Sequence, residues 1–132
     1  MGYERIYMPQ IYTTPQNNSV LMSYMGNFYG TEHYYTNHFL SFKYTDGVKG
    51  FCEQAHAFWL LDIVDIVVRS HKEMAEDLIS ISLMVNQDNT AFITFKDSTN
   101  TIYQQKIPYT DCPIGEWNFF YENNVFFWNG EY

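Results

Sequence analysis

Residues 44–64 read YTDGVKGFCEQAHAFWLLDIV, a turn that leads into an almost wholly apolar stretch. Thr45 or Asp46 can accept hydrogen bonds from the first free N–H groups of a helix. Beyond this start, apolar residues recur at three- and four-residue steps and nearly encircle the helix, which is typical of a helix at the centre of its domain. The stretch predicts one long, largely buried helix from about residue 47 to residue 70.

The sequence on either side of this helix predicts the rest of the fold. Ser19 can cap a short helix that ends near Asn27. From residue 79 the apolar period changes to two, which is typical of half-buried strands separated by polar turns. The sequence predicts an α+β fold, in which the long helix packs on a four- to five-stranded antiparallel meander after a short N-terminal helix. The predicted strands cover residues 79–86, 90–96, 101–109, 116–121 and 124–129.

Length and composition indicate a single folded domain. The chain has 132 residues, of which 46% are hydrophobic and 20% aromatic, enough for a core without disulfide bonds. Residues 1–18 carry two prolines and a loop-like TTPQNN segment, so we expect an extended N-terminal arm there. We expect residues 19–132 to form the single α+β domain.

The charge balance excludes some classes of partner. Seven Lys and Arg residues stand against 15 Asp and Glu residues, for a formal net charge of −8. Binding to nucleic acid or to an anionic membrane needs an excess of cations, so we expect neither. A basic protein partner suits this balance. The N-terminus shows no signal-peptide pattern and no apolar run is long enough to span a membrane, so we predict a cytoplasmic protein.

Several segments resemble an uncharacterised family of small bacterial proteins of unknown function. The matching segments are Gly30 to Glu32, Tyr44 to Lys49, Trp59 to Asp62, and Ile107 to Pro113. The resemblance covers about residues 26–132 and implies no activity or cofactor. Such families occur on bacterial chromosomes, plasmids and phages, and mobile elements carry many short acidic inhibitors of host defence nucleases. This association with mobile elements makes an anti-defence (anti-CRISPR-type) inhibitor, in the cytoplasm of a bacterial host cell, the concrete form of our functional prediction.

Cys52 and His56 lie one helical turn apart and could form a nucleophile–base pair or half of a zinc site. The sequence shows no CxxC pair and no finger-like spacing for further ligands, so we predict neither a metal site nor a cofactor. A buried cysteine and a hydrogen-bonded histidine are the simpler interpretation. The segments discussed above also resemble a family in which the positions of Gly50 to Cys52 and of His56 usually hold aliphatic residues or alanine, so the resemblance implies no special role for Cys52 or His56.

Two helix carboxylates could act together as an acid–base pair. Asp62 and Asp65 lie three residues apart, but Asp65 also precedes Arg69 by four residues, which favours an ion pair. Asp62 falls on the apolar stripe of the predicted helix, so we expect it to face the core and to find hydrogen-bond donors there. We interpret four polar residues as structural: Asp46, His56, Asp62 and Asp111. The alternative is a small enzyme or ligand-binding domain with a pocket around His56 and Asp62, lined also by Tyr34, Tyr35 and His38.

The C-terminal region combines aromatic rings with carboxylates. Residues 107–132 contain four acidic residues and no Lys or Arg. Aromatic residues occupy both faces of the predicted hairpin, whereas a single helix layer covers only one face. Either the N-terminal arm covers the second face or the rings are exposed as partner anchors. Self-association through this hairpin is a third possibility.

The leading prediction is therefore a non-catalytic, acidic protein-binding protein. Its partner would be a basic protein such as a CRISPR effector or another defence nuclease. The predicted partner-binding residues are Glu116, Trp117, Tyr121, Glu122, Phe126, Trp128 and Glu131.

Overall fold

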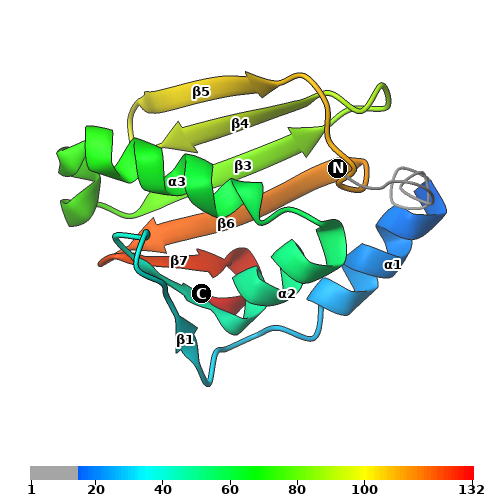
Figure 1. Ribbon diagram of the computed structural model, residues 1–132, viewed down its shortest axis with the longest axis horizontal. Coiled ribbons are helices and arrows are strands. Elements are labelled where there is room, and N and C mark those ends of the chain that lie inside the picture. The colour runs from blue at the N-terminus through cyan, green and yellow to red at the C-terminus, as the bar shows by residue number, and fades with distance from the viewer. Residues whose placement is uncertain (1–14) are drawn as a thin grey trace.

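A computed structural model describes residues 15–132, with the backbone alone for residues 15–17, 75 and 76. Within this range three α-helices lie against one seven-stranded sheet (Figure 1). The α-helices are α1 (Pro15–Met25), α2 (Asp46–Ala55) and α3 (Trp59–Ser70). The strands are β1 (Tyr34–Tyr35), β2 (Lys43–Thr45), β3 (Ile79–Val85), β4 (Ala91–Lys96), β5 (Thr101–Ile107), β6 (Gly115–Glu122) and β7 (Val125–Trp128). Two short 3-10 helices are η2 (Lys72–Glu76) and η3 (Asn129–Glu131).

The predicted long helix over residues 47–70 is wrong, because the chain breaks between α2 and α3. His56 adopts the left-handed conformation, with φ 55° and ψ 47°, and its N–H group bonds the carbonyl of Cys52. Such a residue ends a helix and redirects the chain. The apolar stripe looked nearly complete because it combines the buried sides of two short helices that run in different directions.

The predicted antiparallel meander is also wrong, although the strands lie close to where the sequence places them. The strand order is β1-β2-β7-β6-β3-β4-β5, so β6 pairs with β3 instead of β5. The connection from β5 to β6 is held at the β3–β4 turn, where the N–H of Thr110 donates to the carbonyl of Asn89 (2.9 Å). In addition, β2 pairs in parallel with β7, which makes the sheet mixed. The residues of a turn determine the hairpin that the turn connects, but they do not determine which strands pair when those strands are distant in sequence.

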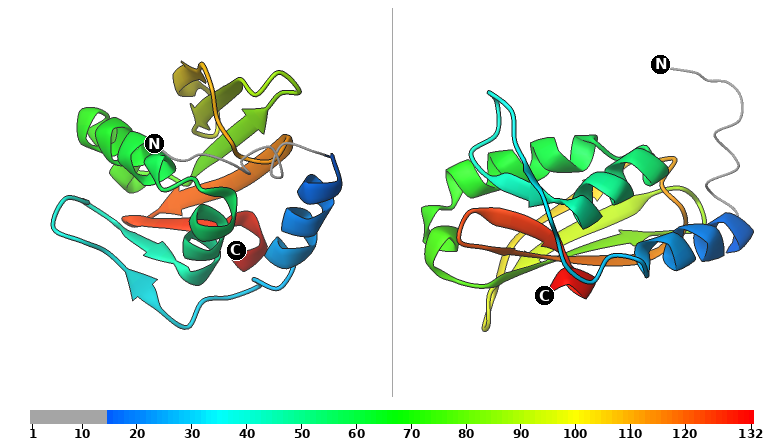
Figure 2. Two further views of the ribbon diagram at one scale, coloured as in Figure 1. Left: turned by 45° about the vertical axis from the view of Figure 1, so that its right-hand side comes forward. Right: turned by 90° about the horizontal axis from the view of Figure 1, so that it is seen from below.

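Helices α2 and α3 cover one face of the sheet and form the core with it (Figure 2, right). The period-two pattern is confirmed in β3, where Ile79, Ile81, Leu83 and Val85 are all buried. Rings from the C-terminal hairpin face the same way, and Phe51 on α2 lies 5.6 Å from Trp117 and 5.0 Å from Phe119 between ring centres. The Phe51–Phe119 pair is edge-to-face and the Phe51–Trp117 pair is tilted, and ring contacts of these kinds stabilise an aromatic core.

Four of the predicted partner anchors therefore lie inside the molecule. The side chains of Trp117, Tyr121, Phe126 and Trp128 are buried. The Trp117 indole donates to the carbonyl of Pro113 (2.9 Å), and the Tyr121 hydroxyl donates to Asn124 (3.2 Å). Strand alternation gives this hairpin one buried face, and these rings occupy it. The prediction that they form an exposed aromatic surface is wrong.

Helix α1 begins earlier than predicted and packs beside α2. Residues 15–18, which we assigned to an extended arm, form its first turn, and the rest of that predicted arm lies outside the described residues. Gly50 allows the segment after α1 to approach α2, because a Cβ atom there would lie only 2.8 Å from the Phe28 ring. None of the described helices is both long enough and apolar enough to cross a membrane.

Candidate functional site

The start of α2 is held by a carboxylate that comes from far along the chain. Glu131 accepts hydrogen bonds from the Thr45 hydroxyl (2.6 Å), the Gly47 N–H (2.9 Å) and the Trp128 N–H (2.9 Å). An anion at a helix N-terminus satisfies free N–H groups and complements the helix dipole. A Cβ atom at Gly47 would lie 2.6 Å from Glu131 Oε1, so only glycine leaves room for this carboxylate. Glu131 thus holds the fold together, whereas we predicted that it faces a partner.

Asp46 joins two of the sequence segments that carried the family resemblance. Its carboxylate accepts the N–H of Glu32 (2.9 Å) and the hydroxyl of Tyr35 (2.7 Å). The Asp46 N–H donates to the Thr31 hydroxyl (3.0 Å). The N–H of Glu32 and then the Tyr35 hydroxyl hold the pKa of Asp46 below its ordinary value, and the bond to Asp46 raises the pKa of Tyr35. Thr45 caps the helix by accepting the Val48 N–H, as the sequence predicts.

A polar hollow of about 350 Å³ opens between the end of α1, β1 and α2. Three carboxylates line it, from Glu32, Asp46 and Glu53. The rings that line it belong to Tyr24, Phe28 and Tyr35. We call this site the α1–α2 hollow.

One cation lines the α1–α2 hollow, and it is already paired. The Lys49 ammonium lies 2.6 Å from Glu53 Oε2 and 5.4 Å from the centre of the Tyr35 ring. The hydrogen bond to Glu53 raises the pKa of Lys49, so the group stays charged. The hollow therefore combines an excess of negative charge with aromatic walls. Among the described residues no group of three or more His, Cys, Asp and Glu side chains is arranged to hold a metal ion.

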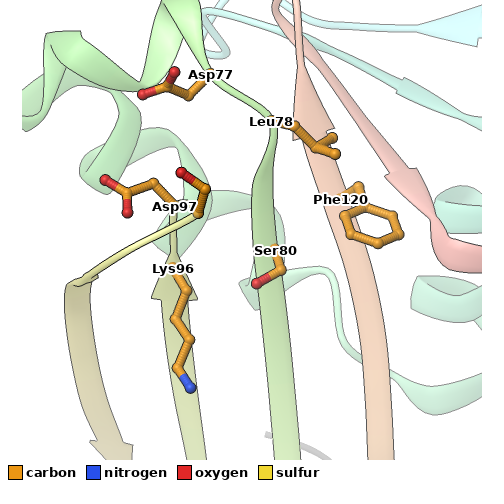
Figure 3. Close-up of a pocket in the computed structure, with 7 residues that line it drawn as sticks. Asp77, Leu78, Ser80, Lys96, Asp97 and Phe120 are labelled. Atoms are coloured by element: carbon orange, nitrogen blue, oxygen red, sulfur yellow. The ribbon is translucent and has the colours of Figure 1, made fainter.

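A second hollow, of about 230 Å³, lies on the sheet face away from α2 and α3 (Figure 3). The carboxylates of Asp77 and Asp97 point to one end of it, and the Lys96 side chain points away from them (Figure 3). Ser80 and Phe120 complete its floor. Asp97 is committed to the β4–β5 turn, because it accepts the N–H groups of Thr99 (2.8 Å) and Asn100 (2.7 Å).

Comparison with known families finds a match over residues 20–132, described as "Family of unknown function (DUF6876)". The chain belongs to this family. The match agrees with the resemblance to an uncharacterised family that the sequence motifs indicate. No curated protein and no solved structure is significantly similar to the chain. Function in this DUF6876 domain has to be argued from the site itself.

The residues of the predicted enzyme pocket do not come together in this DUF6876 domain. Cys52 is buried, and burial raises the pKa of its thiol to about 12, so it is no nucleophile at neutral pH. His56 is exposed at the helix break. Asp62 is exposed on α3, whereas we expected it to face the core and find buried donors. Tyr35 is the one member of that predicted set that lines the α1–α2 hollow.

The remaining predicted polar residues have local roles. Asp65 accepts the N–H and the hydroxyl of Ser41 (both 2.8 Å), and the predicted ion pair with Arg69 is confirmed at 2.8 Å. Burial raises the pKa of Asp65, but the bonds from Ser41 and Arg69 outweigh this, so its pKa lies below the ordinary value. Asp111 accepts the hydroxyl of Tyr109 (2.8 Å) beside the turn that Thr110 stabilises.

Sequence reasoning missed Glu32, Glu53 and Tyr24 as members of one site. Glu32 stands in one of the quoted motifs, and Glu53 follows Lys49 by four residues, so both left a signal in the sequence. Their proximity depends on the packing of α1 against α2, which no local pattern indicates.

Proposed function

We propose that this protein is a non-catalytic binding protein that docks a basic protein partner in the α1–α2 hollow. The observation that carries the proposal is the lining of that hollow, where three carboxylates stand against one lysine, which is itself paired with Glu53. A guanidinium or ammonium group entering the hollow would meet carboxylate oxygens and the faces of tyrosine rings. Both interactions favour an Arg or Lys side chain.

Exposed tyrosines flank the hollow along the chain and supply anchors of the type that hot spots favour. Tyr29 is 85% exposed and Tyr34 is 58% exposed, on either side of the Gly30–Glu32 segment. Tyrosine offers a large apolar ring and a polar tip at little entropic cost. These residues replace the buried hairpin rings as the proposed aromatic anchors.

The net charge of −8 supports the same kind of partner. Exposed charge of one sign steers association with an oppositely charged surface and raises the association rate. The rate should therefore fall as salt increases.

The narrower form of the proposal is an anti-defence inhibitor that acts in the bacterial cytoplasm. A defence nuclease presents Arg and Lys residues where it holds phosphates, and an acidic protein could occupy that surface. Charge complementarity is the support for this form, and it needs a test in cells.

Affinity capture with charge-reversed variants tests the proposal. We expect wild-type protein to capture a basic protein from the host, and Glu32→Lys with Glu53→Lys to weaken that capture at least about tenfold, which is about 1.4 kcal/mol. The matched control is Asp62→Lys with Glu73→Lys, which changes two exposed carboxylates outside the hollow by the same total charge.

The two variants give opposite outcomes if the proposal is correct. Equal weakening of capture by both double variants would show that net charge alone, and not the hollow, mediates binding, and undiminished capture by the Glu32→Lys, Glu53→Lys variant would show that the hollow is not the binding site. Absence of any basic protein from the capture, together with intact defence activity in cells that express the protein, would contradict both forms of the proposal.

A further inference from the structure

The sheet face away from α2 and α3 carries its side chains in rows that cross β6, β3, β4 and β5. The strand registers set these rows, because each residue on that face pairs with one on the neighbouring strand. The first row consists of Glu116, Met84, Phe92 and Lys106. The second row consists of Asn118, Ser82, Thr94 and Gln104. The third row consists of Phe120, Ser80, Lys96 and Thr101, with a register shift between Phe95 and Lys96, and it continues onto β7 as Phe127, whose ring stacks on Tyr132. We call this surface the open sheet face.

The first row combines exposed apolar side chains with one charge of each sign at its ends. Met84 is 41% exposed and Phe92 is 39% exposed, and they are neighbours in the centre of the row. Glu116 lies beyond Met84 on β6, and Lys106 lies beyond Phe92 on β5. The order across the sheet is therefore negative, apolar, apolar, positive.

This order is complementary to itself under a two-fold rotation. An axis that runs parallel to the strands, between β3 and β4, exchanges left and right across the sheet. It sets Glu116 of one chain opposite Lys106 of the other, and Met84 opposite Phe92. An isologous interface requires this kind of self-complementarity. Independently of the proposed function, we infer that the open sheet face binds a second copy of this chain.

The other two rows fit the same axis. In the second row amides meet amides and hydroxyls meet hydroxyls, which can exchange hydrogen bonds. In the third row Lys96 of the second copy stands opposite Ser80, beside the carboxylates of Asp77 and Asp97 (Figure 3). With Asp77 and Asp97 at its edge, the face carries three acidic and two basic side chains, whereas the whole chain carries a net charge of −8. The face is therefore much closer to neutral than the chain as a whole, and two acidic chains can approach there.

The competing two-fold axis, perpendicular to the strands, does not give this match. It would place the first row of one chain against the third row of the other, and Glu116 would then face uncharged side chains. Charge complementarity therefore selects the axis parallel to the strands. Two sheets packed in this way lie about 10 Å apart with their strands rotated by about 30°.

The size of the face sets the expected strength of the dimer. Strands about 4.8 Å apart, with a rise of about 3.3 Å per residue, give four strands a footprint roughly 20 Å on each side. The footprint is roughly 400 Å² per chain, or about 800 Å² in total, which is below the range of stable interfaces and fits only a weak, transient contact. We expect a dimer that dissociates on dilution.

Sedimentation equilibrium of the full chain over a range of concentrations tests the inference. We expect wild-type protein to show a monomer–dimer equilibrium, and Glu116→Lys or Lys106→Glu each to raise the dimer dissociation constant at least about tenfold. The double variant restores opposite charges across the interface, and an equimolar mixture of the two single variants does the same, so both should regain the dimer. Glu73→Lys controls for the change in net charge.

A bifunctional maleimide reports which residues meet. A Met84→Cys chain mixed with a Phe92→Cys chain should form a cross-linked dimer, whereas wild-type protein should not, because Cys52 and Cys112 are both buried. Three results would overturn the inference. The wild-type protein could be monomeric at every concentration, both charge reversals could leave the dimer dissociation constant unchanged, or the double variant could be as monomeric as the single variants. None of these residues lines the α1–α2 hollow, so failure here leaves the proposed function standing.

Discussion

Two carboxylates hold the start of α2, one from within the helix and one from about 85 positions downstream. Asp46 orders the Gly30–Glu32 segment through the N–H of Glu32, and Glu131 satisfies the N–H of Gly47. A buried or half-buried carboxylate that accepts several N–H and O–H groups contributes more than a single surface hydrogen bond. Individual polar residues thus position the walls of the α1–α2 hollow.

Asp46 gives the fold a specific acid sensitivity. Because its pKa is below the ordinary value of 3.8, its contribution to stability is complete above that value and is lost as pH falls through the pKa of the folded state. We expect Asp46→Asn to lower the free energy of unfolding by about 1 kcal/mol at pH 7 and to make its decline below about pH 4 shallower. Urea unfolding at a series of pH values measures this. Asp62→Asn, at an exposed position, should keep the wild-type profile, and parallel curves for all three proteins would refute the role of Asp46.

Glu131 should be the most costly acidic residue to remove from the C-terminal region. Glu131→Ala leaves the Gly47 and Trp128 N–H groups and the Thr45 hydroxyl without their acceptor, so we expect a loss of about 2–3 kcal/mol. Glu116→Ala on the same hairpin should cost less than about 0.5 kcal/mol in dilute solution, where the chain is monomeric. Denaturant unfolding of the two variants gives the comparison. Equal losses would mean that the carboxylate at residue 131 does not cap α2.

For single residues, the sequence predicted local contacts along the chain better than contacts between residues that are distant in sequence. Thr45 as a helix cap and the Asp65–Arg69 ion pair follow from local spacing, and both are present. Asp62 was expected among buried donors because the stripe of one continuous helix would have turned it inward. Glu131 could not be identified as a cap, because its partners are set by the pairing of β2 with β7.

The two helices that replace the expected long one have different packing partners. α2 presents Phe51 to the hairpin rings and its N-terminus to Glu131, while α3 covers the sheet with Leu60, Leu61 and Val64. A single straight helix could not do both, because the sheet is twisted and its two ends face different directions. The break at His56 is what lets each helix follow its own part of the sheet.

Substitution at His56 distinguishes a broken helix from a continuous one. In the left-handed conformation glycine is preferred, so His56→Gly should be more stable than His56→Ala by about 1 kcal/mol. In a continuous helix the order would be reversed by about the same amount. Both variants lack the imidazole, so any contact of that ring cancels in the comparison. Thermal and urea unfolding of the pair decides between the two geometries.

Strands were easier to predict than the helix break. Alternation in Ile79 to Val85 depends only on which face is buried, and the turn residues between strands act locally. The left-handed residue at position 56 is a histidine, which is less typical there than glycine or asparagine, so no local pattern indicated the helix break.

At the scale of the whole molecule, the decisive fact is that helices α2 and α3 cover one sheet face, whereas no described helix covers the face formed by β6, β3, β4 and β5. The covered face explains why the hairpin rings are core residues, and the open face holds the rows that we assign to a second copy. Composition predicted the large core correctly but could not say which strands would be neighbours, because pairings such as β3 with β6 join residues far apart in sequence.

Burial of both cysteines in the core gives a test of global unfolding. Burial raises the pKa of both thiols, so each remains protonated as well as inaccessible at pH 8. We expect a soluble thiol reagent to modify native protein only at the rate at which the core opens, and denatured protein at the rate of free cysteine. Following the modification by mass spectrometry measures both rates. Rapid labelling of native Cys52 would show that α2 detaches from the sheet far more readily than its packing suggests.

The parallel pairing of β2 with β7 also determines when the protein can fold during translation. A ribosome synthesises Lys43–Thr45 about eighty residues before Val125–Trp128, so β2 has left the exit tunnel long before its neighbour exists. Until then the newly made helix start lacks its anionic cap, and the rings of the hairpin are not there to cover Phe51. We therefore expect a ribosome-stalled chain that stops short of residue 125 to be a substrate for chaperones and proteases, and the native sheet to close only after synthesis has passed that point.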